Sequence, residues 1–473
     1  MTRLTGSVVA VLAALAVAPS SAAASVTPIS LPTLSVFDLG KVAGPVLAGD
    51  AIVFGRPTRD GYEVVTRRGA ESSVAKVTVP QAAAGRTSVG AHVEASSERV
   101  VLDVYASTCF SATCEGGAKR TLLGTFTGPL GGDLELVDGC TTRAECAAEP
   151  CHFPRSDVSG DVIAYIDCDG LFRVRDLGPG ADPAGRDFPD LEGGSVRVAG
   201  PYVAASSEPG TLAVLDWRTG DRQYEVEHDP ESGADFDLQE DGKLVYEPDY
   251  REVAWASPTE PTAHPVAQDR SFQELRMADD RIAARRFLPD SHWGHLFELL
   301  ELDTDPSPEA ETEQVSDRDA LPGMDFDGSR LAWIARPCHS AFILVAGDSG
   351  GTEIERGACP FPRVVRGSAW MSRDRRLRLK LACPPQPLRG CRGKALPGGD
   401  RSRPTYYSFR AGGARTVHLD GFPKPCRTRS GRIRVKVVLV IELSGVEPRE
   451  VPYAYRLRTV SARGQTEGLP RCG

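Results

Sequence analysis

The segment at 347–351, Gly-Asp-Ser-Gly-Gly, has the residue types of a nucleophile loop. A serine between glycines lets backbone N–H groups approach an oxyanion, and an upstream histidine would act as the base. His264, in the sequence Thr-Ala-His, precedes Ser349 in the order that such a pair needs. The chemistry would be acyl transfer.

This segment resembles the nucleophile loop of chymotrypsin-like serine proteases, but three features weigh against that activity. His264 lacks a following cysteine and stands before Pro265 in a Pro- and Thr-rich stretch. Only 85 residues separate His264 from Ser349, which is short for two barrels. A turn of Gly, Asp and Ser also needs no catalytic reason. We therefore predict a turn here and no catalytic residue.

Histidines and cysteines give two candidate metal sites. His292 and His295 flank Trp293 and, with Asp290, have residue types that can bind a metal ion, but a solvated loop is the more frequent cause of such a pair. Zinc at the cysteines near His152 would need Cys-x-x-Cys spacing, which is absent. We predict no metal and no cofactor.

Acidic residues offer two further readings. Asp325 with Asp327, and Asp303 with Asp305, resemble parts of calcium loops but lack the full ligand spacing and the closing glutamate. We expect aspartate turns instead. A carboxylate pair for glycoside cleavage cannot be chosen among 64 acidic residues.

The twelve cysteines indicate disulfides. Their number is even, and in an exported chain this favours disulfide bonds over metal binding. Spacing along the chain suggests the following pairs, although sequence does not determine connectivity: Cys109–Cys114, Cys140–Cys146, Cys151–Cys168, Cys338–Cys359, Cys383–Cys391 and Cys426–Cys472.

Residues 1–24 have the three parts of an export signal. Arg3 supplies a positive start, Val8–Ala18 is an apolar run too short to span a bilayer, and Ala22–Ala24 offers small residues for cleavage. No other run approaches the roughly 20 apolar residues of a membrane helix. We expect a secreted or cell-envelope protein without a transmembrane segment in the mature chain.

The segment Ser195–Gly220 contains a pattern of strands and turns that the chain repeats. It predicts a strand, a turn at Gly200, a strand of small apolar residues, and a third strand ending near Asp216. We read its residues as packing and turn residues only. The turn positions recur about every 46 residues, which is typical of propeller blades. The predicted turns of the seven copies fall near Gly49, Ser97, Gly160, Gly200, Gly242, Asp279 and Gly328.

The repeat predicts an all-β fold, a β-propeller of about seven blades over residues 25–365. A lone strand at Leu34–Gly40 would complete the last blade and close the ring. Six or eight blades, or an irregular set of β-sandwiches, are the alternatives. The Gly-Asp or Asp-Gly turn before Ile/Val/Leu-Ala-Tyr/Trp resembles TolB-like and WD-repeat-like propellers of exported bacterial proteins. Repeating Trp-Asp pairs are absent, since Asp216-Trp217 has the reverse order.

Residues 366–473 have a different character and predict a small β-sandwich. Leu377, Leu379 and Leu381 alternate with basic residues, and further short alternating strands follow. The run Leu-Lys-Leu-Ala-Cys at 379–383 resembles immunoglobulin-like tail modules of exported actinobacterial proteins. That resemblance implies a fold and no activity.

Charge divides the chain in the same place. The net charge is −9, but residues 363–473 hold 25 basic and 7 acidic residues, against 30 and 57 before them. The basic tail is read as a solvated strand face, as a contact for an anionic envelope polymer or lipid, or as a surface that docks on the acidic propeller. Nucleic acid is not an expected partner, because no basic groove is interleaved with aromatic residues.

Two functions fit these expectations. The first is an exported, non-enzymatic, monomeric propeller that binds a ligand or scaffolds a protein partner at the cell envelope. The second is a hydrolase or lyase that acts on polysaccharide or peptide at the propeller axis. Carboxylates or histidines that point inward from several blades would favour the second, and an inner rim of Ala, Ser and Gly would favour the first.

Overall fold

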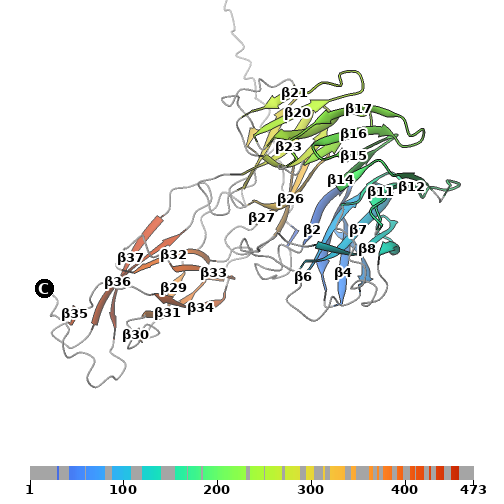
Figure 1. The fold of residues 1–473 in the computed structure, drawn as a ribbon. Helices are drawn as coiled ribbons and strands as arrows, with labels where there is room; N and C mark the ends of the chain where they lie inside the picture. The colour runs from blue at the N-terminus through green and yellow to red at the C-terminus, as the bar shows by residue number, and fades with distance from the viewer. Residues whose placement is uncertain are drawn as a thin grey trace, which may run out of the picture.

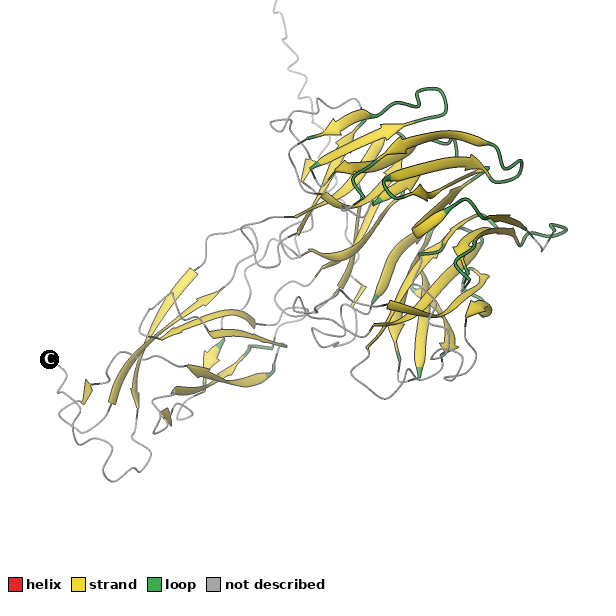
Figure 2. Ribbon diagram, in the orientation of Figure 1, coloured by secondary structure: helices red, strands yellow, loops and turns green. Residues whose placement is uncertain are grey.

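The computed structural model is built of strands throughout its described parts (Figure 2). It describes residues 29–30, 42–58, 60–79, 88–107, 120–139, 155–167, 169–182, 185–230, 235–249, 251–268, 272–287, 295–302, 313–314, 320–335, 342–347, 362–365, 370–371, 377–385, 391–397, 405–410, 412–419, 426–427, 433–441 and 449–457.

Seven four-stranded antiparallel sheets follow one another along the chain as blades 1 to 7 (Figure 1). Blades 1 to 3 are β2 (Ala43–Ala48), β3 (Ala51–Pro57), β4 (Gly61–Arg68) and β5 (Glu71–Thr78); β6 (Ser88–Ala95), β7 (Arg99–Ser107), β8 (Arg120–Pro129) and β9 (Glu135–Gly139); and β10 (Asp157–Ser159), β11 (Val162–Ile166), β12 (Phe172–Asp176) and β13 (Arg186–Phe188).

The other four blades have the same order of strands. They are β14 (Glu192–Ala199), β15 (Tyr202–Glu208), β16 (Thr211–Asp216) and β17 (Arg222–Glu227); β18 (Phe236–Leu238), β19 (Leu244–Asp249), β20 (Glu252–Ala256) and β21 (His264–Ala267); β22 (Phe272–Ala278), β23 (Arg281–Phe287), β24 (His295–Glu301) and β25 (Glu313–Gln314); and β26 (Ala320–Phe326), β27 (Arg330–Ala335), β28 (Phe342–Gly347) and β1 (Ile29–Ser30).

The first strands of successive blades form a closed circle. Strand β2 lies beside both β6 and β26, and each first strand in between lies beside the next. The prediction of an all-β propeller of about seven blades is therefore confirmed, with seven four-stranded sheets. The ring is also closed at its outside, because the early strand β1 is the fourth strand of blade 7, where Ile29 is paired with Ile343. The segment Leu34–Gly40, to which we assigned this role, lies outside the described residues.

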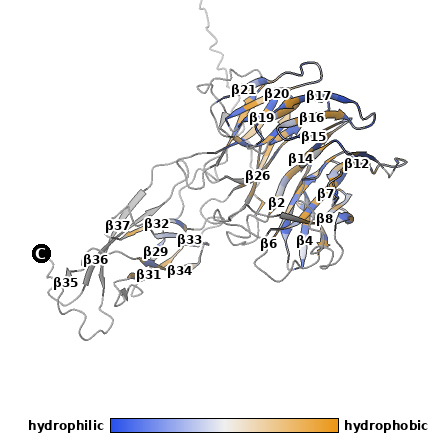
Figure 3. Ribbon diagram, in the orientation of Figure 1, coloured by the Kyte–Doolittle hydropathy of each residue, from blue (hydrophilic) through white to orange (hydrophobic). Residues whose placement is uncertain are grey.

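The second strand of each blade is apolar because neighbouring blades cover both of its faces. In β11 all five residues are buried, and in β15 Val203, Ala204 and Ala205 have no exposed surface. Small side chains let adjacent sheets approach, and the large ones fill the gaps, as Trp333 does beside Phe297. Figure 3 shows the hydrophobic stretches along strands and the hydrophilic ones in the loops between them.

The turn after the first strand requires a left-handed backbone in most blades. Gly200 has φ +54° there, and Asp279 takes the same conformation with φ +53°. Glycine and aspartate are among the residues that adopt it at the least cost. This requirement explains why the turn residues made the repeat visible in the sequence.

The tail contains two further antiparallel sheets, set apart from the blades in Figure 1. One pairs β31 (Leu377–Ala382) with β29 (Arg363–Val364), β30 (Trp370–Met371) and β34 (Ala414–Leu419); the other joins β32 (Cys391–Pro397), β33 (Thr405–Phe409), β35 (Cys426–Arg427), β36 (Ile433–Ile441) and β37 (Arg449–Leu457). Leu377, Leu379 and Leu381 are buried as their alternation predicts, whereas Lys380 is exposed.

Cys383 and Cys391 form a disulfide that joins the ends of strands in the two tail sheets. Each of the five other expected disulfide pairs has at least one cysteine outside the described residues. The expected export signal, residues 1–24, also lies outside them. Among the residues that the structure describes, no helix is long and apolar enough to span a membrane.

Candidate functional site

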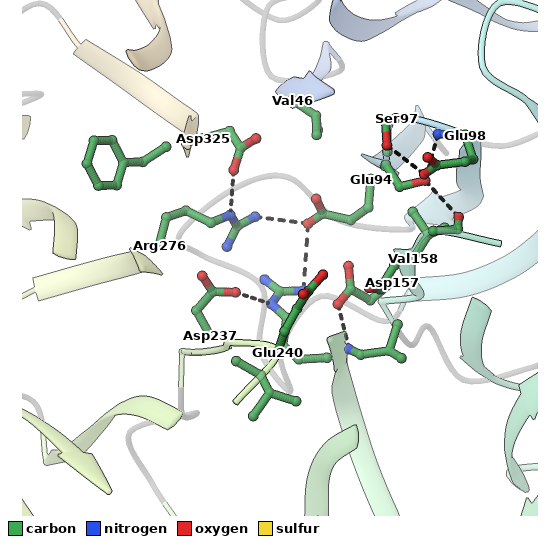
Figure 4. Close-up of a pocket in the computed structure, with 18 residues that line it drawn as sticks. Val46, Glu94, Ser97, Glu98, Asp157, Val158, Asp237, Glu240, Arg276 and Asp325 are labelled. Carbon is green, nitrogen blue, oxygen red and sulfur yellow. Dashed lines mark hydrogen bonds and ion pairs between the residues drawn. The ribbon is translucent and has the colours of Figure 1, made fainter. Parts of the chain in front are cut away.

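One side chain from each first strand lines a single cavity at the centre of the propeller (Figure 4). Because this cavity touches all seven blades, it lies on the propeller axis. We call these seven residues the axial ring: Val46, Glu94, Asp157, Arg197, Asp237, Arg276 and Asp325. Six of the seven are charged, so the axis has no rim of Ala, Ser and Gly.

The axial ring has a nearly fixed place in the repeat, three residues before the turn position in six of the seven blades, while Asp237 precedes Gly242 by five. Arg197 precedes Gly200 by three residues, as Asp157 precedes Gly160 and Asp325 precedes Gly328. Our interpretation of Ser195–Gly220 as packing and turn residues alone was wrong, since Arg197 within it faces the axis. Aligning the seven copies on their turns would have revealed a charged column that single copies do not show.

Three aspartates of the ring attach each blade to the next. Each carboxylate accepts a hydrogen bond from the backbone N–H that follows the ring residue of the next blade. Buried backbone donors need such partners, and losing one costs about 1–3 kcal/mol. The three bonds, each 2.7 Å long, run from Val198 N to Asp157, from Met277 N to Asp237 and from Leu47 N to Asp325.

Glu94 is paired with two arginines from other blades and with His92 of its own strand. Its Oε1 lies 2.9 Å from Arg276 Nη2, 3.6 Å from Arg197 Nη1 and 3.2 Å from His92 Nε2. Burial by itself raises the pKa of this carboxyl, but its three neighbours, Arg276 first, hold the pKa well below its usual value. Glu94 is therefore a carboxylate at neutral pH.

The same two arginines are shared with two aspartates. Arg197 Nε lies 3.3 Å from Asp237 Oδ1, and Arg276 Nε lies 3.2 Å from Asp325 Oδ1. Each guanidinium thus connects two carboxylates of the ring, as Figure 4 shows. Both positive charges are used within the ring, and three of its four carboxylates share them.

Charge alternates around the ring but the alternation is incomplete. From blade 3 to blade 7 the order is Asp, Arg, Asp, Arg, Asp, and blades 1 and 2 then add Val46 and Glu94. Because blade 2 has a glutamate where alternation would need a cation, two acidic residues are neighbours, namely Glu94 and Asp157. Burial, and then the Glu94 charge among others, raises the pKa of Asp157 to about 7 against the opposing effect of Arg197. Burial likewise raises the pKa of Asp325 to about 7.

Arg155, Asp235 and Glu274 stand two residues before ring residues in the chain, and they form a second set of polar contacts, in one case with Arg285 of the second strand β23. Arg155 Nη1 lies 3.5 Å from Asp235 Oδ1, and Arg285 Nε lies 2.9 Å from Glu274 Oε2. The carboxylate of Glu274, whose φ is +62°, accepts the Gly323 N–H at 2.9 Å. Polar contacts therefore extend beyond the axial ring.

The cavity has a volume of about 490 Å³ and opens toward the turns that follow the first strands. Hydroxyl groups of Ser96, Ser97 and Ser159, and the carboxylates of Glu98 and Glu240, surround its mouth. A cavity of this size fits a small organic ligand or the end of a polymer chain.

Of the sequence-based site candidates that the structure describes, one lines this cavity. His264 begins β21, stacks on Trp255 with ring centroids 4.4 Å apart and pairs with Glu260 at 3.2 Å. Ser349, His292, Asp290, Asp303, Asp305 and His152 lie outside the described residues. In the described part of the chain, no group of His, Cys, Asp and Glu is arranged to hold a metal ion.

The candidate that lines the cavity belongs to the Asp325–Asp327 pair, whose two members have different roles. Asp327 caps a turn by accepting the N–H groups of Ser329 and Arg330 at 3.0 and 2.6 Å, as an aspartate turn should. Asp325 instead belongs to the axial ring. The ring was missed as a site because its members are about 40 to 60 residues apart and only the closed propeller brings them together.

Comparisons with known proteins assign this chain to no family. No protein-family model matches the sequence, and no curated protein does. Solved structures similar to this chain include the WD40 domain of Toxoplasma gondii coronin (11% identity, 70% of this chain and 88% of that one, TM-score 0.39). The propeller domain of Myceliophteria thermophila Cps50 (Swd1) has 12% identity, covers 68% and 99%, and has a TM-score of 0.40. A puromycin hydrolase has 13% identity, covers 73% and 59%, and has a TM-score of 0.36.

Proposed function

We propose that this protein is an exported, non-enzymatic propeller that binds a ligand at the cell envelope, and that the axial cavity is the binding site. The observation that supports this most is that the carboxylates of the axial ring are held by ion pairs and hydrogen bonds within the protein. Three of the ring's four carboxylates are bound to arginines, and three accept a backbone N–H from the next blade. Such groups form a rigid polar wall, which suits recognition.

The second candidate is a hydrolase or lyase that acts on polysaccharide or peptide in the same cavity. Inward-pointing carboxylates from several blades favour it. Asp157, with a pKa of about 7, stands beside Glu94, whose pKa is lowered, and an acid next to a carboxylate is what general acid–base catalysis uses. Against it, Glu94 is already engaged by Arg197, Arg276 and His92, which occupy the oxygen that would act on a substrate.

One experiment separates the two candidates. Envelope saccharides and short peptides are screened against the full chain by thermal shift, and every ligand that binds is recovered and weighed by mass spectrometry. Intact ligand supports the binding function, whereas cleaved ligand assigns the protein to the second candidate. If no ligand stabilises the protein, the cavity is not a site of this kind.

A blocked cavity provides the matched control. Ser97 lines the mouth and is exposed, so Ser97→Trp places an indole across the opening without burying a polar group. Thr78→Trp makes the same substitution at an exposed position of the outer strand β5. Binding should be lost only in Ser97→Trp, and loss in both variants would mean that the ligand binds elsewhere.

The basic tail suits contact with an anionic envelope polymer, which is the partner that we propose for it. Arg363 and Lys380 are exposed on the sheet that contains β31. Binding of the full chain to a poly(glycerol phosphate) polymer should weaken steeply with salt, because counterion release and screening dominate such contacts. Arg363→Glu with Lys380→Glu should weaken it further, and binding that ignores salt would exclude this role.

A further inference from the structure

The ion pairs of the axial ring include three of its four carboxylates. Glu94, Asp237 and Asp325 each have an arginine nitrogen within 3.6 Å. Among the described residues, no such partner lies within ion-pair distance of Asp157. Only one of its oxygens has a hydrogen bond, which comes from the Val198 N–H at 2.7 Å.

Asp157 also has the placement of a ligand-binding group. Its residue surface is 8% exposed, and the little that remains faces the cavity, where Figure 4 shows the side chain among the ring residues. Its second oxygen therefore has no protein donor among the described residues. Buried carboxylates in this situation bind a donor from a ligand or remain protonated.

The charge of the cavity indicates the kind of donor. The ring holds four carboxylates and two guanidiniums, and Glu98 and Glu240 add negative charge at the mouth. Both guanidiniums already connect two carboxylates each, so neither has charge to spare for an anionic ligand. A positively charged ligand would complete the alternation at the one place where two acidic residues are neighbours.

We propose that the axial cavity recognises an organic cation, an ammonium or guanidinium group on a small polar molecule, and that Asp157 is its counter-ion. This inference rests on the proposed function of the cavity as a binding site. The serine hydroxyls at the mouth would accept or donate hydrogen bonds to the polar remainder of the ligand. The 490 Å³ volume leaves room for more than the cationic group.

Proton linkage gives this inference a characteristic pH dependence. Asp157 faces Glu94 on β6, Arg197 on β14 and Asp237 on β18, and its pKa of about 7 reflects burial and these charges. A bound cation favours the ionised form, so binding displaces a proton below pH 7. Affinity should therefore rise as the pH increases from 6 to 8 and then level off.

The test is calorimetric titration of the full chain with agmatine, which carries an ammonium and a guanidinium on a four-carbon chain. Butanediol and succinate are the neutral and anionic counterparts. Agmatine should bind, and Asp157→Asn should weaken it at least about tenfold, since a buried charge partner is removed. The asparagine keeps an oxygen for the Val198 N–H, so the blade contact is preserved.

Two further variants keep the test decisive. Asp190→Asn, at an exposed turn of the same blade, should leave binding unchanged. Glu240→Gln, exposed at the mouth, should weaken it about twofold to threefold without affecting folding.

The outcomes separate this inference from the function on which it rests. If succinate or butanediol binds and Ser97→Trp abolishes that binding, the proposal that the ligand is a cation is wrong. The proposal that the cavity is a binding site would still stand. Agmatine binding that Asp157→Asn does not change, or the absence of agmatine binding, would overturn the assignment of Asp157. The screen of envelope ligands would still decide whether the cavity binds anything else.

Discussion

The first and second strands of each blade lie side by side but have opposite chemistry. The second strands are apolar and are covered by sheets on both sides, as β11 and β15 show. The first strands place one charged side chain on the axis in six of the seven blades. Packing of the second strands builds the ring, and the first strands determine what its centre can bind.

The two sets of strands also differ in how their energies arise. Burying apolar surface contributes roughly 25 cal/mol per Å² whatever the pH or salt. A buried ion pair adds little net stability compared with an apolar pair. Removing one partner, however, destabilises the protein because the other charge stays buried without compensation. The losses of stability caused by substitutions in the two sets of strands should therefore differ in their pH dependence more than in their magnitude.

The largest expected effect is in the apolar set. Trp333 has no exposed surface and packs against Phe297 between blades 6 and 7. Trp333→Ala should lower the free energy of unfolding by about 3–5 kcal/mol, because it leaves a cavity between sheets. Urea denaturation at pH 5 and pH 8 should give the same loss. A loss below about 1 kcal/mol would show that the blades do not depend on this packing.

The apolar second strands are also the reason that the fold could be predicted from sequence. Each copy has a short run such as Val-Ile-Ala-Tyr-Ile at 162–166 after a turn residue, and both features follow from local geometry. The sequence predicted that an N-terminal strand would complete the last blade, and we assigned that strand to Leu34–Gly40. In the structure, Ile29–Ser30 is the strand that pairs with blade 7. Two residues of strand leave too weak a pattern to recognise.

The axial ring was only partly predictable. In five of the seven blades a charged residue stands three positions before the turn residue, as Asp157-x-x-Gly160 and Arg197-x-x-Gly200 show. The partner of each charge cannot be read from the sequence, because Glu94 meets Arg276 across 182 residues and only after the ring has closed. A long side chain that crosses an axis follows no local rule.

The next largest effect should come from the charged set. Arg276 is paired with Glu94 and Asp325, and Arg276→Met should cost about 3 kcal/mol because both carboxylates lose a buried cation. Unlike the Trp333 effect, this loss should be smaller at pH 5 than at pH 8, since protonation of Asp325 relieves it. Arg68→Met, in an exposed pair with Asp50, should cost less than about 0.5 kcal/mol.

Asp157 should behave in the opposite direction. Its pKa is about 7 in the folded protein against an ordinary value of 3.8, so the folded state holds a proton that the unfolded state has lost. Stability from this group is present below pH 4 and is lost as the pH rises through 7. Asp157→Asn cannot ionise and should be more stable than the parent by about 1–3 kcal/mol at pH 8.

The control for this prediction is the pH itself. At pH 4 the parent and Asp157→Asn should have equal free energies of unfolding, because Asp157 is then protonated in the folded state. A variant that is less stable at pH 8 would mean that Asp157 stabilises the ring as an anion. Weakened ligand binding would then reflect a structural role and not the loss of a counter-ion.

The smallest effect tests an uncharged polar contact between blades, away from the axis. The hydroxyl of Tyr224 on β17 donates to the carbonyls of Gly242 and Ala256 in blade 5, at 2.7 and 3.2 Å. Tyr224→Phe should cost about 1 kcal/mol, the net value of one buried hydrogen bond. Burial raises the pKa of Tyr224 far above neutrality, so the loss should be the same at pH 5 and pH 8. Tyr406→Phe, 60% exposed in the tail, is the matched control and should change nothing. If the stability lost in Tyr224→Phe depended on pH, a titrating group outside the axial ring would affect this contact. The pH dependence of stability would then not distinguish the axis from the rest of the blades.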